Sequence, residues 1–108
     1  MLSFFLNNML KRDNLNNINE IDEKTLFYLR KHANNVILVD VRSKQEYNEG
    51  HMPGAILLQS FEARQKAEII LKNKNDLIVL YCSTGMRSKK VAKILKEKGY
   101  KNVNVLEQ

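Results

Sequence analysis

Four short apolar runs, most of them rich in β-branched side chains, lie between residues 36 and 106, and only the last is interrupted, by Asn104. A strand that is covered on both faces of a parallel sheet reads as a continuous apolar run, because neither face meets water. The runs therefore predict four buried strands, at residues 36–39, 55–58, 77–81 and 103–106.

Helix start signals stand on either side of the first predicted strand. Asp22 is placed to cap a helix that runs to His32, because its carboxylate can accept from the free amides of a first helical turn. Ser43 and Glu46 have the spacing of a capping box, in which each side chain binds the backbone amide of the other. A second, short helix is therefore expected to begin at Ser43.

Two further helices are expected in the second half of the chain. Ser60 is placed to cap a helix over residues 61–71. Apolar residues at helical spacing predict another helix from Ser88 to Lys98, and Gly99 stands where helices commonly end in a left-handed residue. Strands that alternate with helices in this way predict an α/β domain with a mostly parallel sheet.

Residues 1–16 are expected to form an extension in front of a single domain at 17–108. Its apolar residues at helical spacing are Leu2, Phe5, Leu6 and Met9. They predict an amphipathic helix that docks on the domain. Attachment to a membrane surface is the weaker alternative, because Lys11 and Arg12 supply the only basic charge there. The segment is too short for a transmembrane span and has no cleavage site, so neither a membrane segment nor a targeting signal is expected.

Composition narrows the class of protein. A chain of 108 residues with 44% hydrophobic and 28% charged side chains has ordinary globular usage, which argues against disorder. One cysteine excludes an internal disulfide framework and a cysteine-rich zinc module. A lone thiol fits a reducing compartment, so a cytoplasmic location is expected.

The net charge of +6 is concentrated after the single cysteine, Cys82. Residues 87–108 carry seven basic and two acidic side chains. This excess would favour small anions near the thiol, and a solvated lysine-rich helix face is the alternative. No Trp is present and the few Tyr and Phe have no periodic spacing, so a nucleic-acid partner is not expected.

The segment from Cys82 to Arg87 is a short loop between a predicted strand and a predicted helix. Ligands of open α/β sheets bind just outside the carboxyl ends of strands. Gly85 allows the loop to curl so that backbone N–H groups form an anion-binding nest, and the helix N-terminus adds positive potential. A thiol in that place has a lowered pKa and is a nucleophile. The alternative is a buried structural thiol, but the position, the glycine and the arginine together favour the nucleophile.

These residues resemble two motifs of the rhodanese family of single-domain sulfurtransferases, in order and in spacing, over residues 18–107. The matching segments are Asp40-Val41-Arg42-Ser43, Glu46-Tyr47, Gly50-His51-Met52-Pro53-Gly54-Ala55 and Tyr81-Cys82-Ser83-Thr84-Gly85-Met86-Arg87-Ser88. The resemblance implies a three-layer α/β/α fold with a five-stranded, mostly parallel sheet. It also implies a reaction that needs no metal and no cofactor.

The resemblance also implies that Cys82 carries a persulfide. Its thiolate would attack the outer sulfur of a small anionic donor such as thiosulfate, and cyanide, a thiol or an acceptor protein would then take the sulfur. Arg87 and the loop amides would stabilise the anionic species. The implied substrate-binding residues are Ser83, Thr84, Gly85, Met86, Arg87 and Ser88.

The first motif is expected to be structural. The carboxylate of Asp40 can accept from neighbouring loop amides, and Arg42 and Glu46 are close enough in sequence to pair. His51 is expected to hydrogen-bond a neighbouring loop rather than to act as a general base. Turn geometry before the next strand is expected from Gly50, Pro53 and Gly54.

Loop length separates the alternatives within this resemblance. Phosphatases and arsenate reductases of the same fold carry one more residue between cysteine and arginine, and a docking module would not need Cys82. A persulfide relay to a partner protein stays open beside small-molecule turnover. Ser83 stands where members that favour thiosulfate are often basic, so the donor also stays open.

The chain ends soon after the last predicted strand, where the family usually continues into a final helix. Three alternatives are left open for this part of the sheet. It is exposed, or the N-terminal helix covers it, or the given chain is truncated.

Overall fold

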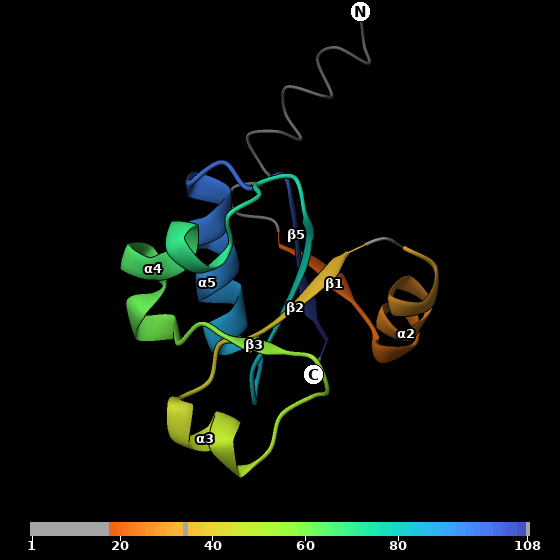
Figure 1. Ribbon diagram of the computed structural model, residues 1–108, viewed down its shortest axis with the longest axis horizontal. Coiled ribbons are helices and arrows are strands. Elements are labelled where there is room, and N and C mark those ends of the chain that lie inside the picture. Colours follow the sequence, from red (N-terminus) through yellow and green to blue (C-terminus); the bar gives the residue numbers. More distant parts are fainter. Residues whose placement is uncertain (1–17, 34, 108) are drawn as a thin grey trace, which may run out of the picture.

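A parallel five-stranded sheet forms the centre of the computed structural model, which describes residues 18–33 and 35–107 (Figure 1). The strands in spatial order are β1 (Asn19–Ile21), β5 (Asn102–Leu106), β4 (Leu77–Tyr81), β2 (Val36–Asp40) and β3 (Ile56–Leu57). Every neighbouring pair is parallel, so the carboxyl ends of all strands lie at the same edge of the sheet.

Helices cover both faces of this sheet. The helical elements are α2 (Glu23–His32), α3 (Lys44–Glu49), the 3₁₀ turn η1 (Ser60–Glu62), α4 (Ala63–Ile70) and α5 (Met86–Glu97). Figure 1 shows α4 and α5 on one side of the sheet, α2 on the other, and α3 beyond its end. The expected three-layer α/β/α fold is therefore confirmed.

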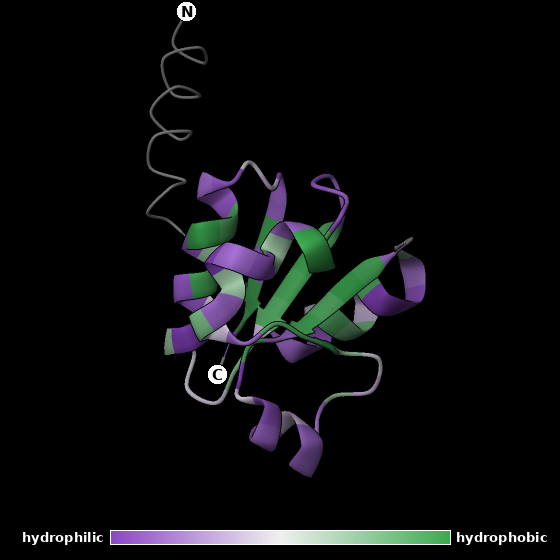
Figure 2. Ribbon diagram, turned by 60° about the vertical axis from the view of Figure 1, so that its left-hand side comes forward, coloured by the Kyte–Doolittle hydropathy of each residue, from purple (hydrophilic) through white to green (hydrophobic). Residues whose placement is uncertain are grey.

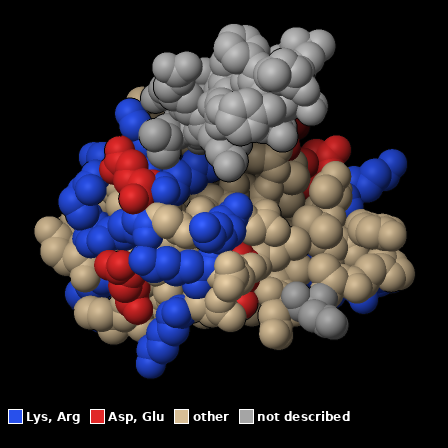
Figure 3. Space-filling model, turned by 90° about the horizontal axis from the view of Figure 1, so that it is seen from above, with Lys and Arg blue, Asp and Glu red and all other residues tan. Residues whose placement is uncertain are grey.

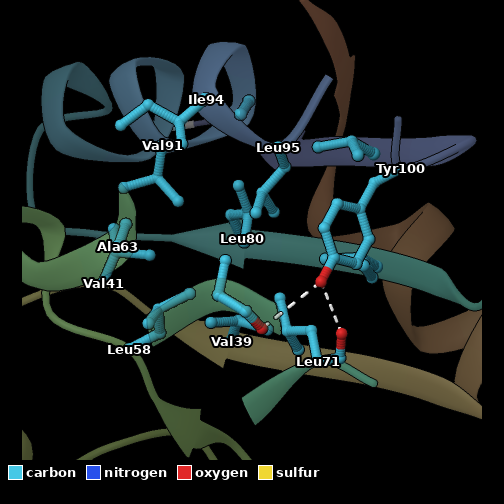
Figure 4. Close-up of a cluster of buried hydrophobic side chains, with 14 of the residues drawn as sticks. Val39, Val41, Leu58, Ala63, Leu71, Leu80, Val91, Ile94, Leu95 and Tyr100 are labelled. Atoms are coloured by element: carbon cyan, nitrogen blue, oxygen red, sulfur yellow. Dashed lines mark hydrogen bonds between the residues drawn. The ribbon is translucent and has the colours of Figure 1, made fainter. Parts of the chain in front are cut away.

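Alternate residues of the strands build two apolar clusters, one on each face. Val39, Leu80 and Val105 pack with α4 and α5 (Figure 4), whereas Leu38 and Val79 pack with Leu26 of α2 on the other face. Figure 2 shows the strands as hydrophobic ribbons and the helices as mostly hydrophilic on their outer sides. Burial on both faces explains why the central strands read as continuous apolar runs.

Local capping signals position α2 and α3 as predicted. The Asp22 carboxylate accepts from the amide of Thr25 at 2.8 Å. Ser43 Oγ accepts from the amide of Glu46 at 3.1 Å, and the Glu46 carboxylate accepts from the amide of Ser43 at 2.9 Å. The capping box is therefore present, and it fixes the start of α3.

Three predicted boundaries were wrong. Ser60 does not cap a long helix. It is the first residue of η1, its amide donates to Val41 O, and α4 begins only at Ala63. Helix α5 begins at Met86 rather than at Ser88, with Gly85 before it in the left-handed conformation. The strand predicted over 55–58 shortens to two residues, Ile56 and Leu57.

Strand β1 was missed when strands were read from apolar runs. It has three residues, of which Asn19 and Glu20 are exposed, and it pairs with β5 alone. An edge strand of this length and polarity gives no apolar run to detect. The family resemblance, which implies five strands, was the better guide.

The predictions for residues 1–16, a docking helix and an N-terminal extension, lie outside the described residues. Among the helices that the structure describes, none is both long and apolar enough to cross a membrane.

Candidate active site

The loop over residues 82–85 connects the carboxyl end of β4 to α5, whose first turn holds Arg87. Gly85 lies at its tightest point with φ of 90°, a backbone conformation that residues other than glycine rarely adopt. The carbonyl of Gly85 accepts from the amide of Lys89 at 3.1 Å and so opens the helical hydrogen-bond pattern. The loop therefore curls tightly against the start of α5.

Backbone amides converge on the sulfur of Cys82. The amide of Gly85 lies 3.0 Å from Sγ, and the amide of Ser88 lies 3.3 Å from it. Cys82 itself is 4% exposed. This arrangement is the anion-binding nest expected from the sequence, and the anion that it stabilises in the free protein is the thiolate.

The pKa of Cys82 is lowered from its ordinary value although the thiol is buried. Burial raises this pKa, but hydrogen bonds from the side chain and backbone of Ser88 and from the amides of Gly85 and Thr84 lower it by more. The thiolate, which is the nucleophilic form, is therefore favoured.

The hydroxyl of Ser88 lies between two groups that compete for its single proton. It is fully buried, lies 3.5 Å from the Cys82 sulfur and donates to Gly85 O at 3.0 Å. A protonated thiol can donate to this hydroxyl, and a thiolate can accept its proton instead. Ser88 thus adapts to both charge states of the sulfur.

Arg87 forms a two-bond ion pair with Glu46 of α3. Its Nη1 and Nη2 lie 2.7 Å and 3.1 Å from the two carboxylate oxygens. The hydrogen bond from Arg87 lowers the pKa of Glu46 to about 2, and the pKa of Arg87 is raised in turn. The guanidinium therefore ties the Cys82 loop to α3.

The predicted ion pair between Arg42 and Glu46 is wrong. Arg42 precedes the first turn of α3, and its guanidinium folds back on Asp40 with Nη2 at 2.7 Å and Nε at 3.0 Å from the carboxylate. Glu46 is held by Arg87 instead, a partner 41 positions further along the chain.

Asp40 is the centre of a buried hydrogen-bond network. Its carboxylate, which is 0% exposed, accepts from the amide of Arg42 at 2.9 Å, as predicted, and from the Tyr81 hydroxyl at 2.9 Å. The Tyr81 oxygen in turn accepts from the amide of Met52 at 2.9 Å, and Arg42 Nη2 donates to Gly50 O at 2.7 Å. The network binds the end of β4 to the 50–52 turn.

Tyr81 was not singled out from the sequence. Burial, together with the hydrogen bond to Asp40, raises the pKa of its hydroxyl, so the hydroxyl stays protonated and donates to the carboxylate. The sequence does contain a signal for this hydrogen bond, because Tyr81 ends an apolar strand directly before the cysteine and a buried phenol needs a polar partner.

A cavity of ≈ 350 Å³ lies beside Cys82. Among the described residues its lining is Arg42, Gly50, His51, Met52, Tyr81, Cys82 and Ser83. It therefore joins the two sequence motifs, one from the first half of the chain and one from the second. Of the other predicted substrate-binding residues, Thr84 and Met86 are exposed and Arg87 is half-buried beside α3.

The turn at Pro53 and Gly54 is present as predicted, whereas His51 contacts helix α3 and not the predicted neighbouring loop. The His51 ring stacks on Tyr47 with centroids 3.6 Å apart, and its Nδ1 lies 2.8 Å from Tyr47 O. The amide of Ala55 donates to Met52 O and closes the turn that holds Pro53. Gly54 is required there, because its φ is +83° and a Cβ would lie 3.0 Å from a guanidinium nitrogen of Arg30.

The positive excess of residues 87–108 lies mainly on the surface of the molecule. In Figure 3, Lys and Arg gather over the side of α4 and α5. Lys89 pairs with Glu20 at 3.5 Å and Lys98 with Glu68 at 3.0 Å. No lysine appears among the described residues that line the cavity, so the solvated helix face is the better interpretation of this segment.

Within the described part of the chain, no group of three or more His, Cys, Asp or Glu side chains could hold a metal ion.

Comparison with known proteins identifies relatives of the chain. A family model described as the rhodanese-like domain matches residues 23–108. The tRNA uridine(34) hydroxylase of Leptospira interrogans is 40% identical over 84 residues, which cover 74% of this chain and 23% of that protein. The thiosulfate sulfurtransferase PspE of Escherichia coli K12 is 34% identical over 65 residues, which cover 60% of this chain and 62% of that protein.

A solved structure described as a rhodanese with anions from E. coli is 31% identical, with a TM-score of 0.61 over 65% of this chain and 82% of that one. The chain spans less than two thirds of the length of either curated relative above. Because the family model matches most of its residues, the chain belongs to the family of rhodanese-like domains.

Proposed function

We propose that the protein is a sulfurtransferase that carries a sulfane sulfur as a persulfide on Cys82. The observation that carries this proposal is the Cys82 sulfur itself, which lies beside a cavity with the amides of Gly85 and Ser88 directed at it. A lowered thiol pKa favours the thiolate, which is the form that a sulfur nucleophile requires.

The reaction has two displacement steps. The Cys82 thiolate attacks the outer sulfur of a donor such as thiosulfate, the S–S bond of the donor breaks, and sulfite leaves with the electron pair. Cyanide or a thiol then attacks the outer sulfur of the persulfide, takes it, and regenerates the thiolate. On the protein the negative charge moves from Sγ to the terminal sulfur of the persulfide and back, and the amides around Sγ would stabilise it in both places.

Arg87 acts in this proposal through the loop. With both of its terminal nitrogens on Glu46, it fixes the position of the segment that carries the amides. Ser83 and Thr84 of the loop and Met86 at the start of α5 are exposed, and donor and acceptor would arrive there.

The relatives support this class of reaction. PspE of E. coli is named a thiosulfate sulfurtransferase, and the loop of this chain has the four residues between cysteine and arginine that resemble the sulfur-transfer form. A thiolate that must stay reduced between turnovers also fits a reducing compartment such as the cytoplasm.

Relay of the persulfide to an acceptor protein is the second candidate. Met86, the first residue of α5, is 77% exposed and offers a partner an apolar contact next to the reacting segment. Another relative, from Bacillus subtilis, is named a putative sulfur carrier protein.

Turnover with thiosulfate and cyanide tests the proposal. The full chain should form thiocyanate, and Cys82→Ser should reduce the rate to a few per cent or less, because a serine hydroxyl is a far poorer sulfur nucleophile. Near-native thermal unfolding of Cys82→Ser would show that the loss is chemical. Residual turnover comparable to that of the unmodified chain would remove Cys82 from its role.

A further inference from the structure

Arg42 has one nitrogen that the Asp40 network does not use. Nε and Nη2 both donate to the Asp40 carboxylate, and Nη2 also donates to Gly50 O. Within residues 18–33 and 35–107, Nη1 has no hydrogen-bond partner. In a planar guanidinium, a carboxylate on the Nε–Nη2 edge leaves the two Nη1 hydrogens pointing away from it.

The same side chain lines the cavity beside Cys82. Arg42 is the one lysine or arginine among the described lining residues, and its guanidinium carbon lies 5.7 Å from the centre of the Tyr81 ring. With a fully buried carboxylate behind it and the aromatic ring beside it, the guanidinium is fixed in place before any ligand arrives. Its side chain keeps 18% of its surface exposed.

Among the described residues, no other basic group near the sulfur is placed to bind an anionic donor. Arg87 donates to Glu46 through both terminal nitrogens, and Ser83, the residue after Cys82, is uncharged. An anionic donor approaching a thiolate meets repulsion unless a cation faces it. In the described cavity, that cation is Arg42.

We propose that Arg42 determines donor specificity by holding an oxyanion through Nη1 while the neighbouring sulfur atom faces Cys82. The proposal rests on the sulfur-transfer function and refines it to small donors whose transferable sulfur is bonded to a sulfonate-like group, which leaves with the electron pair of the broken S–S bond. Asp40 has a double task, since it both anchors the guanidinium and directs its free N–H groups into the cavity.

Alkylation of the single cysteine tests the anion contact without any sulfur chemistry. In the full chain the thiolate displaces iodide from iodoacetate, which bears a carboxylate, or from iodoacetamide, which is neutral and of similar size. Intact mass follows each adduct. The ratio of the two rates cancels the thiolate fraction, because both reagents attack the same sulfur. We expect Arg42→Met to lower the iodoacetate-to-iodoacetamide ratio about tenfold, the size of one charge-assisted hydrogen bond.

Arg42→Met leaves the Asp40 carboxylate buried without a cation, so a second pair of variants removes that difficulty. Asp40→Asn keeps Arg42, whereas Asp40→Asn with Arg42→Met lacks it, and neither contains a buried carboxylate at position 40. The ratio should be higher in the first than in the second, because only the first keeps the guanidinium. Lys44→Met, which removes an exposed lysine outside the cavity lining, should leave the ratio as it is.

The outcomes separate the two proposals. A ratio unchanged by the loss of Arg42, in variants that melt as folded proteins, overturns the specificity role whether or not sulfur transfer occurs. A lowered ratio together with a raised KM for thiosulfate supports it. A lowered ratio in a protein that forms no thiocyanate would keep the anion site and reject the sulfurtransferase function.

Discussion

Two arginine–carboxylate pairs hold the active site together, and they differ in the burial of the carboxylate. Asp40, paired with Arg42, has none of its side chain exposed, whereas the side chain of Glu46, paired with Arg87, is 34% exposed. Both pairs have a shortest distance of 2.7 Å. An equal shortest distance does not mean equal energy, since water screens the second pair much more than the first.

This difference separates a stability role from a positioning role. Removing the arginine of a buried pair leaves an uncompensated charge in the interior, which is strongly destabilising. Removing the arginine of an exposed pair leaves a carboxylate that water can solvate. The Asp40 pair therefore supports the fold around the cavity, and the Glu46 pair mainly sets where the Cys82 loop lies.

The largest effect is expected from Arg42→Ala. It should lower the free energy of unfolding by about 3–5 kcal/mol, because the Asp40 carboxylate is left buried and unpaired. Urea denaturation at neutral pH measures this loss, and adding Asp40→Asn should recover much of it. A loss under about 1 kcal/mol would show that the two pairs are energetically alike.

Arg87→Met should affect activity more than folding. The free energy of unfolding should change by less than about 1 kcal/mol, while formation of thiocyanate should slow on the order of tenfold as the loop loses its tie to α3. Arg64→Met, at an exposed ion pair with Glu97 at 3.4 Å, is the matched control and should leave the rate unchanged. A purely thermal defect in Arg87→Met would contradict the positioning role.

Ser88→Ala should move the pH profile of persulfide formation. Hydrogen bonds from Ser88 lower the pKa of Cys82, so losing the hydroxyl raises that pKa and shifts the rising limb of the profile to higher pH. On the acidic side of the profile the rate should drop about fivefold, the size of one hydrogen bond. Ser60→Ala, outside the loop, serves as control, and an unshifted limb in Ser88→Ala would exclude the hydroxyl from setting the thiol pKa.

The smallest effect concerns acid stability. The pKa of Glu46 in the folded protein is about 2, below its ordinary value of 4.5, so its contribution is present above pH 4.5 and is lost as the pH falls toward 2. Glu46→Gln should therefore show a shallower loss of urea stability between pH 5 and pH 2 than the unmodified chain. Parallel curves would indicate that the exposed pair is fully screened.

Sequence reasoning recovered what is encoded locally. The capping box at Ser43 and Glu46 involves side chains three positions apart, and the nest at Cys82 follows from a strand, a glycine and a helix in a row. The apolar runs identified the central strands because both of their faces are covered. Each of these features depends on neighbours along the chain.

What depends on distant partners was missed or assigned to the wrong neighbour. The predicted partner of Glu46 was Arg42, four positions away. Its partner in the structure is Arg87, which lies in the first turn of α5, directly after the loop that follows β4. The link from Met52 through Tyr81 to Asp40 likewise joins three separate segments. No spacing rule reports such contacts, because sheet order alone creates them.

The central claim is that Cys82 accepts a sulfur atom as a persulfide. Intact-protein mass spectrometry before and after incubation with thiosulfate tests it most directly, with Cys82→Ser in parallel. The account predicts a gain of one sulfur atom that cyanide reverses and that the variant lacks. A chain with a reduced, alkylatable Cys82 that gains no sulfur from thiosulfate or from polysulfide would contradict it.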